Sequence, residues 1–266
     1  MDSTTVKAKS SFKVRGEEGF IHIDDGGEGG IPVLFAHSFA GSTRHWKKQL
    51  EHLRKTRRAI AFDFRGHGQS EVPSEKDVFK IEQLADDISA VADSLGLDHF
   101  ILVGHSMGGA TSIEYAAKHP ERVAGLLIAG VPPKISKEQS EPIMKSLRSE
   151  AYQKVMNDYV KAQLMGAKPA TDSLMKPSYQ KIDKETTINS VDALFSGDPG
   201  TALKKYNGPK LIVSSVAEEK QPITLHKQEP AIPFKTIDNS SHWIMLDQPD
   251  EFTRILDEFI NSIDKR

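Results

Sequence analysis

The sequence predicts an α/β fold, in which a doubly wound, mostly parallel sheet is interrupted by one helical insertion. Three observations lead to this prediction. Short apolar runs recur along the chain and are typical of strands buried on both faces. Segments with apolar residues at helical spacing separate these runs, and strands that alternate with helices form parallel sheets. From Pro132 to about Gly208 the strand-like runs stop and only helical spacing remains.

Eight runs are the candidate strands. The first two alternate, and we expect Asp24, Asp25 and the glycines after them to end the second. The later runs are almost purely apolar, as in the buried centre of a parallel sheet. In chain order the runs are Ser11–Arg15, Phe20–Ile23, Pro32–Ala36, Arg58–Phe62, Phe100–Val103, Val123–Ala129, Leu211–Val213 and Pro233–Ile237.

Three helices stand out from the same pattern. One runs from Ile81 to Leu95 and should stop at Gly96, because glycine readily takes the left-handed conformation that follows a helix. A second covers Met107 to Lys118. The last contains Phe252 to Ile263 and is expected to open at Asp247 and Pro249. The basic cluster, which consists of Arg54, Lys55, Arg57 and Arg58, sits at a predicted helix end, and we expect it to be a solvated face.

The long helical stretch is too long for a loop inside a domain. We therefore divide the chain into a core, residues 1–131 and 208–266, and a helical cap, residues 132–207.

Composition excludes several classes of protein. The 266 residues include no cysteine, which removes disulfides, thiol catalysis and cysteine-bound zinc. A net charge of −2 argues against a nucleic-acid-binding domain. No apolar stretch is long enough to span a membrane, and the first residues are polar, so we expect a cytoplasmic protein with no membrane partner.

The strongest chemical signal is the hexapeptide Gly104-His105-Ser106-Met107-Gly108-Gly109. It matches G-x-S-x-G directly after a predicted strand and directly before a predicted helix, which is the context that this motif requires. On such a sharp turn the serine Oγ stands clear of the sheet, and small residues two positions either side let the backbones approach. The turn also leaves the Met107 N–H pointing at the same space. Ser106 is therefore our candidate nucleophile.

At this point the chain resembles the α/β-hydrolase superfamily along most of its length. His37-Ser38-Phe39-Ala40-Gly41-Ser42 looks like the oxyanion loop of that family, and Asp63-Phe64-Arg65-Gly66-His67-Gly68-Gln69-Ser70 looks like its D-x-R-G-x-G-x-S turn. The resemblance implies an eight-stranded sheet, a cap over the active site and a Ser, acid, His triad in that chain order. It also implies that the epoxide-hydrolase and dehalogenase branches, which need an aspartate nucleophile, are excluded by Ser106.

Among ten histidines, His242 is the candidate base, because it follows the last predicted strand, where the catalytic histidine of the family lies. His105 should point away from the serine and pack. His37 and His67 match structural positions of the family. We expect the remaining histidines to lie on the surface or the cap; they are His22, His45, His52, His99, His119 and His226. No metal-ligand spacing occurs, so we expect neither a metal nor a cofactor.

The acid departs from the family pattern. The family usually has an aspartate after the strand that follows the cap, but this strand is followed by Glu218 and Glu219 and contains no aspartate. Glu218 aligns best, Glu219 is the runner-up, and a residue elsewhere stays open. By resemblance, the backbone N–H groups of Phe39 and Met107 form the oxyanion hole, and the Phe39 ring either lines the pocket or packs in the core.

The cap should lie over Ser106, at the edge of the sheet where α/β folds bind ligands. Its apolar residues, among them Met144, Leu147, Met156, Leu164 and Leu194, should divide between core packing and pocket lining. These expectations predict a serine hydrolase acting on an ester, lactone or thioester of a small molecule, as a monomer or homodimer. The alternatives are a small-molecule receptor without turnover and a carbon–carbon bond hydrolase.

Overall fold

The computed structural model describes residues 10–75 and 78–265 and shows one eight-stranded sheet. The strand order is β1-β2-β4-β3-β5-β6-β7-β8. Strand β2 runs antiparallel to its neighbours β1 and β4, and the other pairs are parallel, which confirms the predicted fold class. The bounds are β1 (Ser10–Gly16), β2 (Gly19–Gly26), β3 (Val33–Ala36), β4 (Ala59–Phe62), β5 (Phe100–His105), β6 (Val123–Ala129), β7 (Lys210–Ser215) and β8 (Phe234–Ile237).

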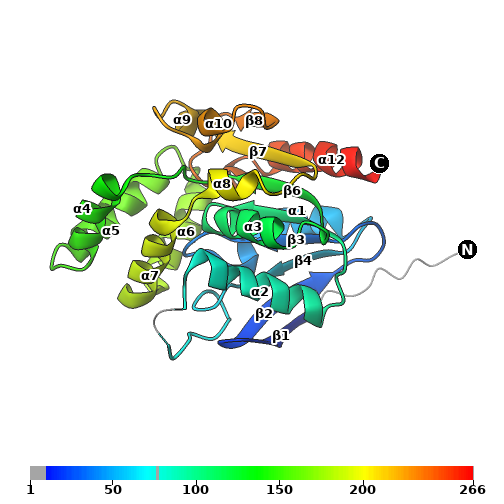
Figure 1. The fold of residues 1–266 in the computed structure, drawn as a ribbon, viewed down its shortest axis with the longest axis horizontal. Coiled ribbons are helices and arrows are strands. Elements are labelled where there is room, and N and C mark those ends of the chain that lie inside the picture. The colour runs from blue at the N-terminus through cyan, green and yellow to red at the C-terminus, as the bar shows by residue number, and fades with distance from the viewer. Residues whose placement is uncertain (1–9, 76–77, 266) are drawn as a thin grey trace, which may run out of the picture.

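Helices cover both faces of this sheet (Figure 1). Helices α2 (Ile81–Ser94), α3 (Met107–Lys118) and α8 (Pro199–Leu203) pack side by side on one face. Helices α1 (Lys47–Leu53) and α12 (Pro249–Asp264) pack together on the other. Short helices lie in the connections: η1 (Thr43–Trp46), α9 (Val216–Glu219), α10 (Leu225–Gln228) and α11 (Ile244–Asp247). Gly96 follows α2 at φ +63, as its predicted role as a helix stop requires.

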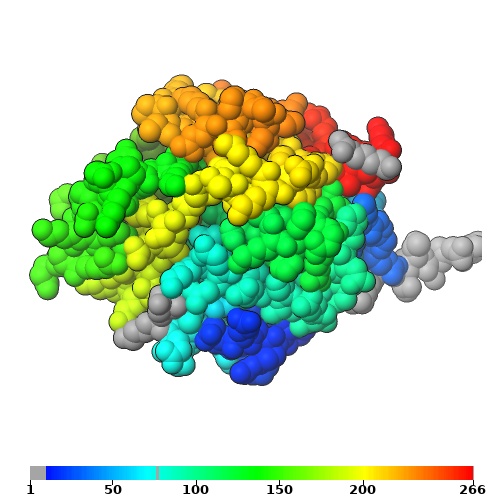
Figure 2. Space-filling model, viewed as in Figure 1, coloured from blue at the N-terminus to red at the C-terminus, as the bar shows by residue number. Residues whose placement is uncertain are grey.

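Between β6 and β7 the chain forms only helices. They are α4 (Lys137–Leu147), α5 (Tyr152–Gln163), α6 (Pro169–Lys181), α7 (Lys184–Ser196) and then α8. We call α4 to α7, residues 137–196, the helical segment. This segment projects from one edge of the sheet (Figure 1) and forms one end of the molecular surface (Figure 2).

The end of β2 and the basic cluster differ from the sequence prediction. Strand β2 continues through Asp24 and Asp25 to Gly26, because arginines of the cluster neutralise both carboxylates. Arg54 Nη2 donates to Asp24 Oδ1 at 2.8 Å, and the Arg58 guanidinium donates to both oxygens of Asp25 at 2.8 and 3.1 Å. Three of the four cations in the basic cluster are therefore partly buried in structural ion pairs, and the third pair joins Arg57 to Asp264. Only Lys55 of this cluster is exposed.

The central strands position the chemistry. Every residue of β3, β5 and β6 is buried, so these strands are held on both faces. Because β3, β5, β6 and β7 are parallel, the loops after them meet at one edge of the sheet. Those loops begin at His37, Ser106, Gly130 and Val216, and the helical segment stands over the same edge (Figure 1).

Candidate active site

Ser106 occupies a strained turn between β5 and α3. Its φ of 52° and ψ of −114° are unusual for a residue with a side chain. The flanking glycines allow the turn: a Cβ on Gly108 would lie 2.3 Å from the His37 carbonyl oxygen, and one on Gly104 would lie 2.5 Å from the Gly108 oxygen. The Ser106 N–H donates to the Ala129 oxygen of β6 at 2.8 Å. The backbone thus holds the hydroxyl at the sheet edge, as the motif predicts.

The acid and the histidine meet beside this serine. His242 lies after β8, and its Nδ1 is 2.5 Å from Glu218 Oε1, which confirms the predicted contact. The second oxygen of Glu218 accepts hydrogen bonds from the Ser214 hydroxyl and the Ser215 N–H, both at 3.1 Å. Burial alone would raise the pKa of Glu218, but the neighbouring His242 and these hydrogen bonds lower it overall. Glu218 is therefore held as a carboxylate against the imidazole.

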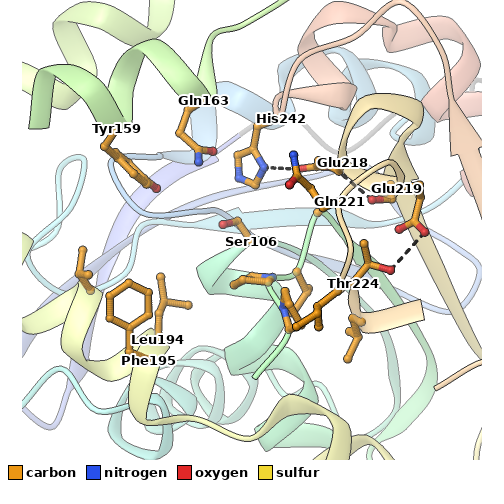
Figure 3. Close-up of a pocket in the computed structure, with 18 of the residues that line it drawn as sticks. Ser106, Tyr159, Gln163, Leu194, Phe195, Glu218, Glu219, Gln221, Thr224 and His242 are labelled. Carbon is orange, nitrogen blue, oxygen red and sulfur yellow. Dashed lines mark hydrogen bonds and ion pairs between the residues drawn. The ribbon is translucent and has the colours of Figure 1, made fainter. Parts of the chain in front are cut away.

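Glu219 faces a different group. Its Oε2 accepts from the Thr224 hydroxyl at 3.2 Å, and Figure 3 shows it on the far side of Glu218 from His242. The reason for the difference is the start of α9. Ser215 caps this helix by accepting from the Glu218 N–H at 3.1 Å, so the position three residues into the helix returns to the strand end, and the next position turns away.

Two residues that the sequence analysis did not identify for this role, His105 and Asp247, hold the His242 loop in place. The Nε2–H of His105 donates to the His242 carbonyl at 2.9 Å, with the two rings 4.6 Å apart, so His105 contacts the base as well as packing. Burial lowers the pKa of His105 well below 6.5, which keeps it neutral. Asp247 Oδ2 accepts from the Ser241 N–H at 2.9 Å and from its hydroxyl at 2.5 Å.

Asp247 does not open the last helix, contrary to the sequence prediction; that helix begins at Pro249, after Gln248. The other oxygen of Asp247, Oδ1, accepts a hydrogen bond at 2.8 Å from the N–H of Lys168, which lies just before α6. Asp247 therefore also ties the helical segment to the His242 loop. The only sequence signal for this role is a carboxylate five positions after His242 inside an apolar stretch, Ile244-Met245-Leu246, where a buried charge needs partners.

The oxyanion loop is braced by His37. Its Nδ1–H donates to the Ser38 oxygen at 2.7 Å, and its Nε2 accepts from the Phe64 N–H at 2.9 Å. Burial lowers the pKa of His37 to about 4, so this neutral arrangement persists at neutral pH. Ser38 does not need a positive φ; Ala40 takes one instead, at 56°. Serine is therefore accommodated where the family commonly has glycine.

The side chains of Phe39 and Met107 are buried and do not line the cavity at Ser106. The Phe39 ring packs against His67, Tyr159 and Tyr179, so its predicted alternative, packing in the core, is the one observed. In the described ranges, the backbone N–H groups of Phe39 and Met107 have no protein acceptor. Of these two residues, the backbone N–H groups and not the side chains are therefore the candidates for binding an oxyanion.

Ser106, Glu218 and His242 open into one cavity of about 440 Å³ (Figure 3). The helical segment covers it, as predicted, and supplies about half of its apolar side chains: Ile143, Leu147, Val155, Met156, Val191, Leu194 and Phe195. Among the five apolar residues that we expected to divide, Leu147, Met156 and Leu194 line the cavity, whereas Met144 and Leu164 are buried elsewhere. The cavity also receives Tyr159 and Gln163 from α5, and the loop from Gln221 to His226.

Over residues 10–75 and 78–265, no three histidine, aspartate or glutamate side chains are grouped so that they could hold a metal ion. The same described residues include no helix of the length and hydropathy that a membrane span needs.

Comparisons with known proteins agree with this fold. Residues 31–166 match the family described as alpha/beta hydrolase fold. Over 112 residues, 42% of this chain, the sequence is 33% identical to Epoxide hydrolase 4 of Mus musculus, and the match spans 31% of that protein's length. The enol-lactonase from Burkholderia xenovorans LB400 superposes with a TM-score of 0.80 at 22% identity, covering 94% of this chain and all (100%) of that one. A thermophilic esterase from Thermogutta terrifontis gives 0.79 at 23% identity, covering 97% and 99%.

Proposed function

The chain belongs to the α/β-hydrolase fold family, and we propose that it is a serine hydrolase that cleaves a carboxylic ester, lactone or thioester of a small molecule. The observation that carries the proposal is the 2.5 Å contact between Glu218 and His242 beside Ser106, on the wall of one cavity. The fold alone hosts many chemistries, so the proposal rests on this site.

The first half of the reaction forms an acyl-enzyme. Ser106 Oγ attacks the substrate carbonyl carbon, and its proton passes to His242 Nε2. The Phe39 and Met107 N–H groups donate to the oxyanion of the tetrahedral intermediate. His242 then returns the proton to the leaving oxygen or sulfur as that bond breaks, which leaves an acyl group on Ser106.

The second half repeats these steps with water. His242 takes a proton from a water molecule that attacks the acyl carbon, and then protonates Ser106 Oγ as the acid leaves. Glu218 keeps Nδ1 protonated and stabilises the imidazolium that forms twice per cycle. Its lowered pKa suits this role, because an acid that stayed neutral could not balance the positive charge.

The nucleophile, Ser106, argues against epoxide opening, which is the activity that the name of the mouse relative suggests. Epoxide opening in this family implies an aspartate at the position of Ser106. A serine there favours acyl transfer, in line with the esterase and lactonase that share the fold. The receptor alternative rests on the departure of the acid loop from the family pattern. The 2.5 Å contact between Glu218 and His242 supports the hydrolase instead.

Steady-state turnover tests the proposal. Purified protein is incubated with p-nitrophenyl esters of two to ten acyl carbons and with simple lactones, with Ser106→Ala as the control. We expect continuous release of product by the wild type and covalent labelling of Ser106 by a fluorophosphonate, read by mass spectrometry. A single burst of one equivalent, without further turnover, would favour the receptor alternative instead.

A further inference from the structure

The Gln163 side chain is a polar exception in the apolar wall of the cavity. It is the last residue of α5, and the α5 residues Val155 and Met156 line the same cavity with apolar side chains. Its Oε1 is buried, and no partner for it exists among the described residues. A buried amide oxygen without a partner is rare in folded proteins and calls for an explanation.

The amide lies close to the reaction centre. Figure 3 shows Gln163 beside His242, with its amide facing the space above Ser106. Two of the hydrogen-bonding side chains around His242 already have partners. Glu218 contacts the Nδ1 of His242, and His105 donates to its main-chain oxygen. Gln163 is thus free to contact a ligand whose carbonyl is at Ser106.

Desolvation gives this position its selectivity. The Gln163 side chain lines the cavity, so rotation of its amide presents either the oxygen or the nitrogen to water before a ligand binds. An apolar acyl chain displaces that water without replacing its hydrogen bond. A ligand with a donor at the same point restores the bond. The penalty therefore falls on substrates that lack the donor, and leaving a buried polar group unpaired commonly weakens binding by roughly fivefold to a hundredfold.

We infer that Gln163 is a specificity-determining residue that selects substrates with a hydrogen-bond donor, a hydroxyl or an amide N–H, near the reacting carbonyl. The inference rests on the proposed function for where the carbonyl lies. A hydroxyl is the best probe, since it both donates and accepts and therefore suits either orientation of the amide.

A matched substrate pair tests it. Phenyl hexanoate and phenyl 3-hydroxyhexanoate differ by one hydroxyl. We expect the wild type to favour the hydroxylated ester by about tenfold in kcat/KM. Gln163→Leu, close to glutamine in size, should remove this preference, because the plain ester no longer leaves an amide unpaired and speeds up, whereas the hydroxylated ester loses its partner and slows down. Gln163→Met provides the same test if the leucine variant does not fold.

The control is the same substitution elsewhere on the cavity wall. Gln221 lines the cavity but is exposed to solvent, so its amide keeps water in the complex, and Gln221→Leu should retain the preference. Equal kcat/KM for the two esters in the wild type, or a preference that survives Gln163→Leu, would overturn the inference.

Binding separates this inference from the proposed function. With Ser106→Ala, calorimetry should show the hydroxylated ester binding about tenfold more tightly than the plain ester, and the difference should vanish in Ser106→Ala/Gln163→Leu. If the wild type hydrolyses neither ester, the proposed function fails, and the binding difference still decides the role of Gln163. Equal binding of both esters would overturn the inference even where turnover is observed.

Discussion

The loop around His242 and the helical segment that faces it across the cavity are built differently. In the loop, several hydrogen bonds hold each of two carboxylates: Glu218 accepts from three donors, and Asp247 accepts from Ser241 and from the Lys168 N–H. The segment presents mainly branched and aromatic side chains, together with the unpartnered Gln163 amide. A side chain with several hydrogen-bond partners is held in one position, whereas apolar contacts specify only the volume and shape of the cavity wall.

This difference assigns separate tasks to the two regions. The reaction requires atoms within hydrogen-bond reach, so it depends on the sheet edge and its braced loops. We expect substrate choice to depend on the helical segment, where residues can change size without disturbing the triad. Substitutions in each region test this division, from the largest expected effect to the smallest.

Removing the nucleophile should have the largest effect. We expect Ser106→Ala to lower kcat by about 10⁴-fold or more, because triad members act as a unit. Ser106→Gly should lose the same activity and remain at least as stable as the wild type, since glycine accepts a φ of 52° without strain. Initial rates and thermal unfolding measure both effects. Retention of most esterase activity in either variant would show that another nucleophile operates.

The two adjacent glutamates offer a matched comparison within the loop. Glu218→Gln should lower kcat by roughly 10³- to 10⁴-fold, because the amide no longer balances the imidazolium and no longer selects its tautomer. Glu219→Gln changes a residue that contacts Thr224 and should alter kcat by less than about threefold. Equal losses in the two variants would mean that Glu218 is not the acid.

Acid should destabilise the core through its buried histidines. Burial lowers the pKa of His37, His45 and His67 from 6.5 to about 4. Between these values the unfolded chain binds protons that the folded chain excludes, so the free energy of unfolding falls as pH falls. Each such histidine contributes up to about 1.4 kcal/mol per pH unit. The helical segment contains no histidine, so this loss originates in the core.

Urea unfolding between pH 7.5 and 4.5 measures this slope. The exposed His99 provides a control, because His99→Gln removes a histidine from the surface and should leave the slope unchanged. A free energy of unfolding that stays constant across this range would contradict the burial of these three rings in the folded state.

The smallest effect is expected from the cavity wall. Val155→Phe adds volume inside the cavity and should lower kcat/KM for octanoyl esters by about tenfold while leaving acetyl esters nearly unchanged. Val160→Phe, on the same helix but outside this cavity, is the matched control and should keep the wild-type chain-length profile. A uniform loss on all acyl lengths in Val155→Phe would show that the segment also positions the triad.

Much of the fold is predictable because its signals are local. The eight candidate strands, the helix at Ile81 and the helix at Met107 all follow from residue spacing, and the structure confirms them. Ser106 and His242 follow from motif and chain position. The predictions that were wrong have a common cause. Asp24 and Asp25 resemble the end of a strand, because the arginines that neutralise them, Arg54 and Arg58, lie about thirty positions further along the chain.

The histidines show the same limit. The sequence predicts His22 and His45 on the surface or the cap, yet both are buried. His22 Nδ1 is 2.9 Å from Asp63, 41 positions away, and the His45 ring packs against Trp243, next to the candidate base. Nothing close to either histidine in the sequence indicates these partners.

By itself, the sequence determined the sheet and the nucleophile turn, since strand period, helix period and the G-x-S-x-G turn depend on neighbouring residues. The resemblance to the family then implied the candidate base, His242. Only the tertiary structure decided between Glu218 and Glu219, placed His105 and Asp247 against the His242 loop and turned Gln163 into the cavity. The physical reason is the range of the contacts. Hydrogen bonds join atoms within about 3 Å, and the chain brings such atoms together from distant positions only after the sheet and the helical segment have packed.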